Sequence, residues 1–336
     1  MTNNNFDFLR LIFALFVIVS HSYILTGNTS EDWLYRSTLG QTMWSKVGVM
    51  GFFIISGYLV FQSLSRSPSA LDYLLKRLRR ILPGLFVMLL FTIIVLPLVY
   101  DNSVFYLKNI DVLTYIPRNM ILATQHRIAG VFSGNPYPNV INGSLWTIRY
   151  EVLLYIILLC FIKVRHRKSI VATISFTIWI GSITLLWLLD ESILEVNFIF
   201  RVKNLLQLSS CFFSGVMLAS VDFHRAKKIL PLVTICSVVL FVIAAFYNLL
   251  DHIFFVIMPF LVLSIALYPL PYIRSIGKTI GDISYGIYIY SFLIQQMIVY
   301  FLKPTTTQLL LLSIVITIPI AFASWHLVEK RFLQRK

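Results

Sequence analysis

An arginine and a histidine lie in the first apolar segment of the chain, and both residue types can do chemistry in such surroundings. Residues 6–23 read FDFLRLIFALFVIVSHSY, and Arg10 and His21 are eleven residues apart. In an α-helix this spacing places them on one face, roughly 16 Å apart along the axis. Asp7 can pair with Arg10 on that face. A neutral imidazole accepts protons near pH 7, so His21 is a candidate general base. The alternative is a histidine hydrogen-bonded between packed helices.

A second group of chemically capable residues is basic. Residues 74–84 read LLKRLRRILPG, with four basic residues within five positions before a proline. Arg77 and Arg80 are three residues apart, so two guanidinium groups can face the same way on a helix. Such a pair suits phosphate groups. The alternative is an ordinary basic anchor beside a membrane.

A third constellation contains a carboxylate in an apolar run. Residues 142–156 read NGSLWTIRYEVLLYI, and Glu151 enters this run at the second position after Arg149. An ionisable group in a membrane segment is costly and needs a partner. His21 is one candidate, because a carboxylate beside an imidazole fixes its tautomer and raises its basicity. A structural pair with Arg149 or Arg118 is the alternative.

Two further patterns are weaker. Gly51, Ser56 and Gly57 in VMGFFIISGYLV, and Gly215 in CFFSGVML, are small residues that permit close helix packing. The tyrosines and serines of ISYGIYIYS, residues 283–291, either line a channel or form hydrogen bonds between helices. We interpret both patterns mainly as packing. Three cysteines, Cys160, Cys211 and Cys236, lie in apolar runs without paired spacing, which predicts neither a disulfide framework nor a metal site.

The elements that must position these residues are membrane helices. Only 12% of the 336 residues are charged and 58% are hydrophobic, with a mean hydropathy of +0.82, whereas soluble domains have about 25% charged residues. The sequence predicts an all-α, polytopic membrane protein that forms one domain over residues 1–336, with a first helix that is retained rather than cleaved as a signal. We expect ten spans, at about 8–26, 47–64, 81–99, 146–162, 169–189, 204–221, 230–249, 253–270, 283–301 and 308–327.

The distribution of charge predicts the orientation of these spans. With ten spans, 19 of the 28 Lys and Arg residues fall on one side and nine on the other. The positive-inside rule places the first side, and both termini, in the cytoplasm. The net charge of +14 then reflects topology, and because it is divided among short loops we expect no nucleic-acid partner. The external stretch at about 100–145 reads as turns in its second half and is a candidate binding loop.

These motifs, taken in order, resemble the acyltransferase family 3 proteins, which are integral-membrane acyltransferases of cell-surface glycans. Arg10 and His21 resemble the family's Arg-x10-His motif, GFFIISGYLV its FFxxSG segment, and Arg77 with Arg80 its Arg-x-x-Arg motif. LWTIRYEVLLY resembles the LWSLxxExxxY segment and places Glu151 on the family's glutamate. CFFSGVMLA and ISYGIYIY match weaker patterns, so the resemblance covers about residues 6–295.

The chain departs from the family pattern at two places. Ser291 stands where many members carry a histidine near the ninth span, and Thr147 replaces the serine of the LWS pattern. Neither change removes a residue that the expected chemistry needs.

The resemblance implies a multi-pass protein of the cell (inner) membrane that takes an acyl group, usually acetyl, from cytosolic acyl-CoA. It implies that Arg77, Arg80 and Arg10 hold the phosphates of acetyl-CoA. His21 is expected to act as general base or to help relay the acyl group, Glu151 to orient the imidazole, and Arg10 to belong with these two to the catalytic residues. No metal is implied.

The implied acceptor is a hydroxyl of a cell-surface or lipid-linked glycan. Asn142, Trp146 and Tyr150 are the expected acceptor contacts. We expect the chain to act alone or with a separate partner, because it carries no segment like the extracellular SGNH-type hydrolase-like domain of some relatives.

Two other functions remain open from sequence. In a transporter or flippase, Asp7, Arg10, His21 and Glu151 would form a proton or substrate path, although the chain lacks paired halves with matching interrupted helices. A membrane scaffold would leave the intramembrane arginine and histidine without a role.

Overall fold

The protein is built from helices, as the composition predicts. The computed structural model describes residues 4–197, 200–271 and 273–334. Within these ranges the only extended pairings are two isolated β-bridges, Tyr100 with Val131 and Asn197 with Arg201. Arg335 and Lys336, which belong to the basic side in the charge count, lie outside the described residues.

Nine helices in the described part of the chain are long and apolar enough to cross a membrane, and the prediction of a polytopic protein is confirmed. The expected seventh span is a shorter apolar helix, α10 (Leu230–Phe246). The long helices are α1 (Phe6–Leu25), α3 (Trp44–Arg66), α4 (Ala70–Val95), α6 (Trp146–Leu159), α7 (Lys168–Leu188), α9 (Val202–Ser220), α11 (Leu250–Leu267), α13 (Ser284–Leu302) and α14 (Thr306–Ser324). Short 3-10 turns on both sides of α6 extend its span to Gly143–Lys163. The short ones are α2 (Trp33–Ser37), α5 (Ile110–Met120), α8 (Glu191–Leu194), α12 (Ile276–Ile280) and α15 (Lys330–Gln334), and a π-helix (Trp325–Glu329) joins α14 to α15.

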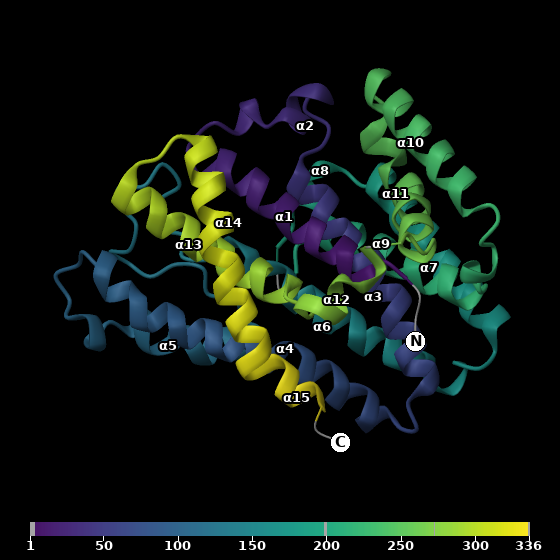
Figure 1. The fold of residues 1–336 in the computed structure, drawn as a ribbon, viewed down its shortest axis with the longest axis horizontal. Helices are drawn as coiled ribbons and strands as arrows, with labels where there is room; N and C mark the ends of the chain where they lie inside the picture. The colour runs from purple at the N-terminus through teal and green to yellow at the C-terminus, as the bar shows by residue number, and fades with distance from the viewer. Residues whose placement is uncertain (1–3, 198–199, 272, 335–336) are drawn as a thin grey trace.

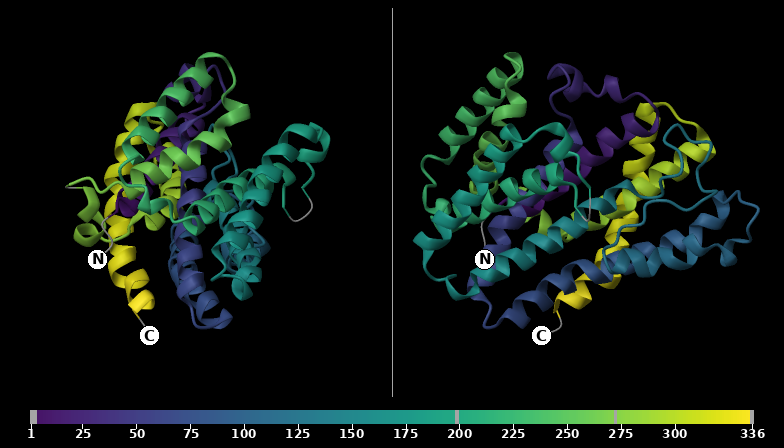
Figure 2. Two further views of the ribbon diagram at one scale, coloured as in Figure 1. Left: turned by 90° about the vertical axis from the view of Figure 1, so that its right-hand side faces the viewer. Right: turned by 180° about the vertical axis from the view of Figure 1, so that it is seen from behind.

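The spanning helices form a layered bundle (Figure 1). Helix α3 packs between α1 and α9, α7 covers the other side of α9, and α13 and α14 pack on α1. Helix α10 packs mainly on α11 at one margin, while α4 and α5 form the opposite margin, as the reverse view also shows (Figure 2). The central helix α3 therefore contacts elements from both halves of the sequence.

The start of the first span and the end of the last span lie at the same end of the bundle. Arg10 near the start of α1 and Arg80 in α4 both contact Asp282, and Arg80 also lies near Glu329 at the end of the π-helix. The last span therefore returns to the side from which the first began, as an even number of spans predicts. We call this side, which carries most of the basic loops, the basic end.

Helix α4 begins earlier than predicted, and this changes the setting of the basic cluster. The sequence predicts a span at 81–99, but the helix begins at Ala70, where the Ser69 hydroxyl accepts a hydrogen bond from the Asp72 amide as an N-cap. Pro83 lies inside the helix. Arg77 and Arg80 are therefore on a regular helix, where their long side chains can lie along apolar surface and keep the charged groups in polar surroundings.

The stretch at about 100–145, which the sequence predicts to be external, is more ordered than predicted. It contains α5, which the sequence analysis did not expect, whereas residues 121–142 are irregular as predicted. The irregular segment is anchored to α13, where the Gln296 amide donates to the Tyr137 and Val140 carbonyls and the Asn135 amide donates to Gln296. Buried amide bonds of this kind hold a long loop in one conformation.

The small residues bring α3 and α9 into backbone contact, which confirms their predicted packing role. A Cβ atom added at Gly57 would collide with the Phe212 carbonyl, and one added at Gly215 would collide with the Ile54 carbonyl. Without a hydrophobic force between helices in lipid, such close contact is a main source of association.

We predict that Gly57→Ala destabilises the folded protein by about 1–3 kcal/mol, because the added methyl meets fixed backbone. Thermal unfolding in detergent measures the effect. Gly181→Ala in α7 is the matched control, since a Cβ atom there meets nothing within 4 Å. Equal melting temperatures for the two variants would contradict the packing role.

Candidate active site

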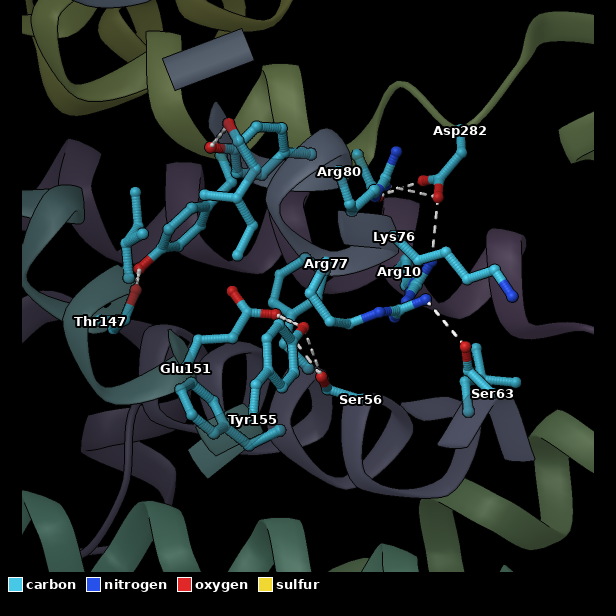
Figure 3. A pocket seen from close by; sticks show the side chains of 18 of the residues that line it. Arg10, Ser56, Ser63, Lys76, Arg77, Arg80, Thr147, Glu151, Tyr155 and Asp282 are labelled. Carbon is cyan, nitrogen blue, oxygen red and sulfur yellow. Dashed lines mark hydrogen bonds and ion pairs between the residues drawn. The ribbon is translucent and has the colours of Figure 1, made fainter. Parts of the chain in front are cut away.

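A cavity of about 390 Å³ opens at the basic end of the bundle, between α1, α3, α4, α6, α13 and the end of the last span (Figure 3). We call it the inner cavity. More basic than acidic side chains line it, and its charged groups come from α1, α3, α4, α6 and the α12–α13 connection. The charged lining residues are Arg10, Arg66, Lys76, Arg77, Arg80, Glu151 and Asp282. The cavity is therefore suited to an anion.

Asp282 joins two of the predicted arginines. Its carboxylate accepts from Arg10 at 2.9 Å and from Arg80 at 2.6 Å, and its other oxygen accepts from the Ser284 hydroxyl at 2.6 Å. Burial acts to raise the pKa of Asp282, but the charges of Arg80 and Arg10 and the Ser284 bond hold it below its ordinary value. The predicted pair of Asp7 with Arg10 is wrong, because Arg10 turns to Asp282 instead.

Arg80 is enclosed on further sides. Its guanidinium lies 5.8 Å from the ring centre of Tyr285 and 5.5 Å from that of Trp325, and 3.9 Å from a carboxylate oxygen of Glu329. Glu329 is buried in the π-helix and accepts from the Ser324 hydroxyl. Irregular turns of this type are frequent at functional sites. The charge of Arg80 is therefore largely compensated within the protein.

Arg77 lines the same cavity as Arg80, as their spacing predicts, but it has a different environment. It donates to the Ser63 hydroxyl at 3.3 Å and lies 5.9 Å from the ring centre of Tyr155. No carboxylate pairs with it among the described residues, and its buried Nε atom has no hydrogen-bond partner there. No carboxylate of the described residues therefore neutralises the charge of Arg77.

Glu151 of α6 also lines the inner cavity. Its carboxylate accepts a short hydrogen bond from the Tyr155 hydroxyl, which also bonds to Ser56 at 3.0 Å (Figure 3). Ser56 therefore has a polar contact as well as its packing role. The cluster satisfies a carboxylate that would otherwise be costly in the membrane.

A second cavity, of about 230 Å³, lies toward the opposite end of the bundle, and we call it the outer cavity. Its lining, in the part of the chain that the structure describes, mixes polar and apolar residues, with Lys46 as a cation and no acidic residue. The residues are Val17, His21, Ser45, Lys46, Val49, Met50, Gly143, Ser144, Trp146, Asn204, Gln207 and Tyr288.

His21 is in the outer cavity and not beside Glu151. Its ring packs edge-on against Phe292, 5.0 Å between centres, and its buried Nδ1 atom has no partner in the described ranges. The described structure contains no hydrogen bond or ion pair between His21 and Glu151, so the expected contact is not formed. Glu151 is bound to Tyr155 and does not reach the imidazole. The Nδ1 atom of His21 can therefore form a hydrogen bond with another group.

A thin layer of side chains divides the two cavities. Val49 of α3 and Tyr288 of α13 line both. The Tyr288 hydroxyl donates to the Ser144 carbonyl at 3.0 Å and bonds to the Thr147 hydroxyl at 2.8 Å. Ser144 faces the outer cavity and Thr147 the inner one. We call Val49 and Tyr288 the dividing wall.

The three expected acceptor contacts fall in different places. Trp146 lines the outer cavity. Asn142 is fully buried, where its amide donates to the Ile289 carbonyl and its oxygen accepts from the Ser144 amide. The Tyr150 hydroxyl is also buried and accepts from the Arg201 amide. Asn142 and Tyr150 therefore support the site, and Trp146 alone faces an open space.

Sequence reasoning misses the partners that complete the site. Asp282 could have been identified from the sequence, because it is an acidic residue just before a predicted span. Tyr155 lies four residues after Glu151 on one helix, which is a spacing that brings two side chains together. Tyr288 falls among the residues interpreted as packing, and no local signal distinguishes it from Tyr285.

Comparison with known proteins finds one family model and curated relatives that cover nearly the whole chain. Residues 3–326 match the family model described as an acyltransferase domain. The chain is 30% identical to a protein of Shigella phage Sf6 named O-acetyl transferase, over 99% of this chain and 97% of the relative. It is 28% identical to nodulation protein 10 of Rhizobium leguminosarum bv. viciae, over 97% of this chain and 92% of the relative. No solved structure gives a significant match.

We predict that Asp282→Asn lowers the free energy of unfolding by about 3 kcal/mol, because the partly buried Arg10 loses its counter-charge and Arg80 keeps only the more distant Glu329 at 3.9 Å. Thermal unfolding in detergent at pH 7 measures this. Asp72→Asn is the control. It breaks a single ion pair, with Lys76, that is more exposed to solvent, and it should cost about 0.5 kcal/mol or less. A control as unstable as Asp282→Asn would refute the special role of the buried carboxylate.

The same comparison has a defined pH dependence. The pKa of Asp282 is depressed in the folded state, so its charge stabilises the protein above the ordinary Asp pKa of about 4. That stabilisation is lost as the pH falls through the depressed value. We expect the difference in melting temperature between wild type and Asp282→Asn to shrink as the pH falls below about 4. A difference that stays unchanged from about pH 5 to about pH 3 would contradict the assignment.

Proposed function

The chain belongs to the acyltransferase domain family, and on that basis we propose that it moves an acyl group, in particular acetyl, from cytosolic acyl-CoA to a hydroxyl of a cell-surface or lipid-linked glycan. The observation that carries the proposal is the pair of cavities that meet at the dividing wall. Several arginines line one, and a single cation, Lys46, which pairs with Asp251, lines the other. A donor and an acceptor can approach this wall from opposite sides of the membrane.

The inner cavity is the proposed donor site. Coenzyme A is an anion with several phosphate groups, and guanidinium forks bind phosphate well. Arg77 and the exposed Arg66 are the proposed first contacts, because Arg10 and Arg80 already neutralise Asp282. Arg10 and Arg80 then fix the shape and the potential of the cavity, a change from the sequence-based assignment of both as direct contacts. The basic loops support a cytosolic position for this end.

The outer cavity is the proposed acceptor site, and its polar groups support a sugar. Asn204 and Gln207 lie one turn apart on α9 and line the cavity. The buried Ser144 hydroxyl there has no partner in the described part of the chain. Amides and hydroxyls bind sugar hydroxyls, and the Trp146 ring offers an apolar face with a polar edge.

The proposed reaction joins the two sites at the wall. His21 accepts the proton of the acceptor hydroxyl, whose oxygen forms a bond to the acyl carbonyl carbon as the carbon–sulfur bond of the thioester breaks. The proton passes from the imidazole to the coenzyme A thiolate, which leaves as the free thiol. Glu151, Tyr155 and Ser56 lie on the donor side, where they would bind the acyl-pantetheine end.

Transfer by the reconstituted protein tests the function. Protein in liposomes receives acetyl-labelled acetyl-CoA and a lipid-linked glycan, and labelled glycan is measured. We expect His21→Asn to lose at least about a hundredfold in rate, the size of a general-base contribution, while its melting temperature stays near wild type. His252→Asn, an exposed histidine on α11, is the control. Equal transfer by wild type and His21→Asn would remove His21 from the mechanism.

A strain lacking the gene separates this function from transport. We expect mass spectrometry to find surface glycans of normal length that lack acyl groups. Normal acylation with blocked glycan export would instead favour a transporter or flippase.

We predict that Arg77→Ala raises the KM for acetyl-CoA about tenfold with a smaller change in kcat, because one charge-assisted bond to phosphate is lost. Arg77→Lys should recover some of the loss, and added salt should narrow the difference. Arg225→Ala, an exposed basic residue away from the cavity, controls for general charge. An unchanged KM in Arg77→Ala would exclude Arg77 from donor binding.

A further inference from the structure

We propose that Val49 and Tyr288 limit the size of the acyl group, so that the protein prefers acetyl over longer chains. This inference rests on the proposed transfer between the two cavities and deepens it. Both residues line both cavities, and each is only 8% exposed. For direct transfer, the acyl carbonyl carbon must come within bonding distance of the acceptor oxygen, which places the acyl chain against this wall.

Val49 is the fixed portion of the wall. Its neighbours Gly48 and Gly51 bring α3 against Phe13 of α1, since an added Cβ at Gly48 would lie 2.6 Å from the Phe13 carbonyl oxygen and one at Gly51 would collide with the Phe13 ring. The helix backbone around Val49 therefore has no room to move toward α1. Only the side chain of Val49 determines how far the wall extends at this point.

Tyr288 is the portion of the wall that is held by hydrogen bonds. Its hydroxyl bonds to the Ser144 carbonyl and the Thr147 hydroxyl, and its ring meets Phe52 edge-on at 5.8 Å. These contacts come from α3 and from the segment that starts α6, so the ring is positioned by two elements besides its own helix. A ring held at its far end fills a constant volume, whereas a ring held only at its base can turn aside.

The consequence is selection by size. An acetyl group places only a methyl beyond the carbonyl carbon. Each additional methylene must enter space that the Val49 methyl groups or the Tyr288 ring already fill, and added methylenes in packed space are unfavourable. Pockets of this kind discriminate by roughly tenfold or more for each methylene.

Competition between acetyl-CoA and butyryl-CoA tests the proposal in the reconstituted protein. Val49→Ala should raise the ratio of butyryl to acetyl transfer about tenfold. Val60→Ala is the matched control, because it makes the same change in a buried valine of α3 that lines neither cavity. The control should keep the wild-type ratio.

Tyr288→Phe provides a second, independent variant, because it keeps the ring and removes both hydrogen bonds. We expect it to transfer acetyl and to raise the butyryl ratio, as the ring is no longer held. An unchanged ratio in Val49→Ala and Tyr288→Phe, with acetyl transfer retained, would overturn the wall as the selector and leave the acyltransferase function intact. A wild-type protein that transfers neither group from coenzyme A would overturn both.

Discussion

The need to neutralise charge inside a membrane bundle organises the whole inner cavity. Asp282 meets Arg10 of α1 and Arg80 of α4, and Arg80 continues to Glu329 at the end of the last span. Unpaired charges in these surroundings would be expensive, so the three spans and the start of α13 are held together by their mutual compensation. Arg77 lies just outside this network, and no carboxylate pairs with it among the described residues.

The sequence predicts the features of this structure that depend on local pattern. Hydropathy predicts the nine long helices of the described residues and the shorter α10. The i, i+3 spacing correctly predicts that Arg77 and Arg80 line one cavity. Helix α4 begins at Ala70, after its N-cap Ser69, whereas hydropathy predicts a start at residue 81. The difference arises because a hydropathy window leaves out the charged turns that precede the apolar part of the helix. Pattern describes apolar faces well and helix ends poorly.

Contacts between distant segments are what pattern cannot supply. Arg10 and Asp282 are 272 residues apart, and Asp7 is the nearer and wrong choice. Sequence reasoning brings His21 and Glu151 together because both are ionisable and lie in apolar runs, yet Tyr155 satisfies Glu151 on its own helix. Topology gives the depth of a residue in the membrane, but the direction in which it faces depends on how the helices pack.

The thin wall between the cavities also has an electrical consequence. In the proposed transfer, a neutral thioester on one side and a neutral hydroxyl on the other become a neutral thiol and a neutral ester. The acyl group crosses the wall outward, and the process carries no current only if the proton crosses inward through the same layer. A proton released to the outer water would move one elementary charge through the membrane field, which costs about 2.3 kcal/mol for each 100 mV. The route of the proton from the outer cavity, which both His21 and Tyr288 line, therefore decides whether acylation is coupled to the membrane voltage.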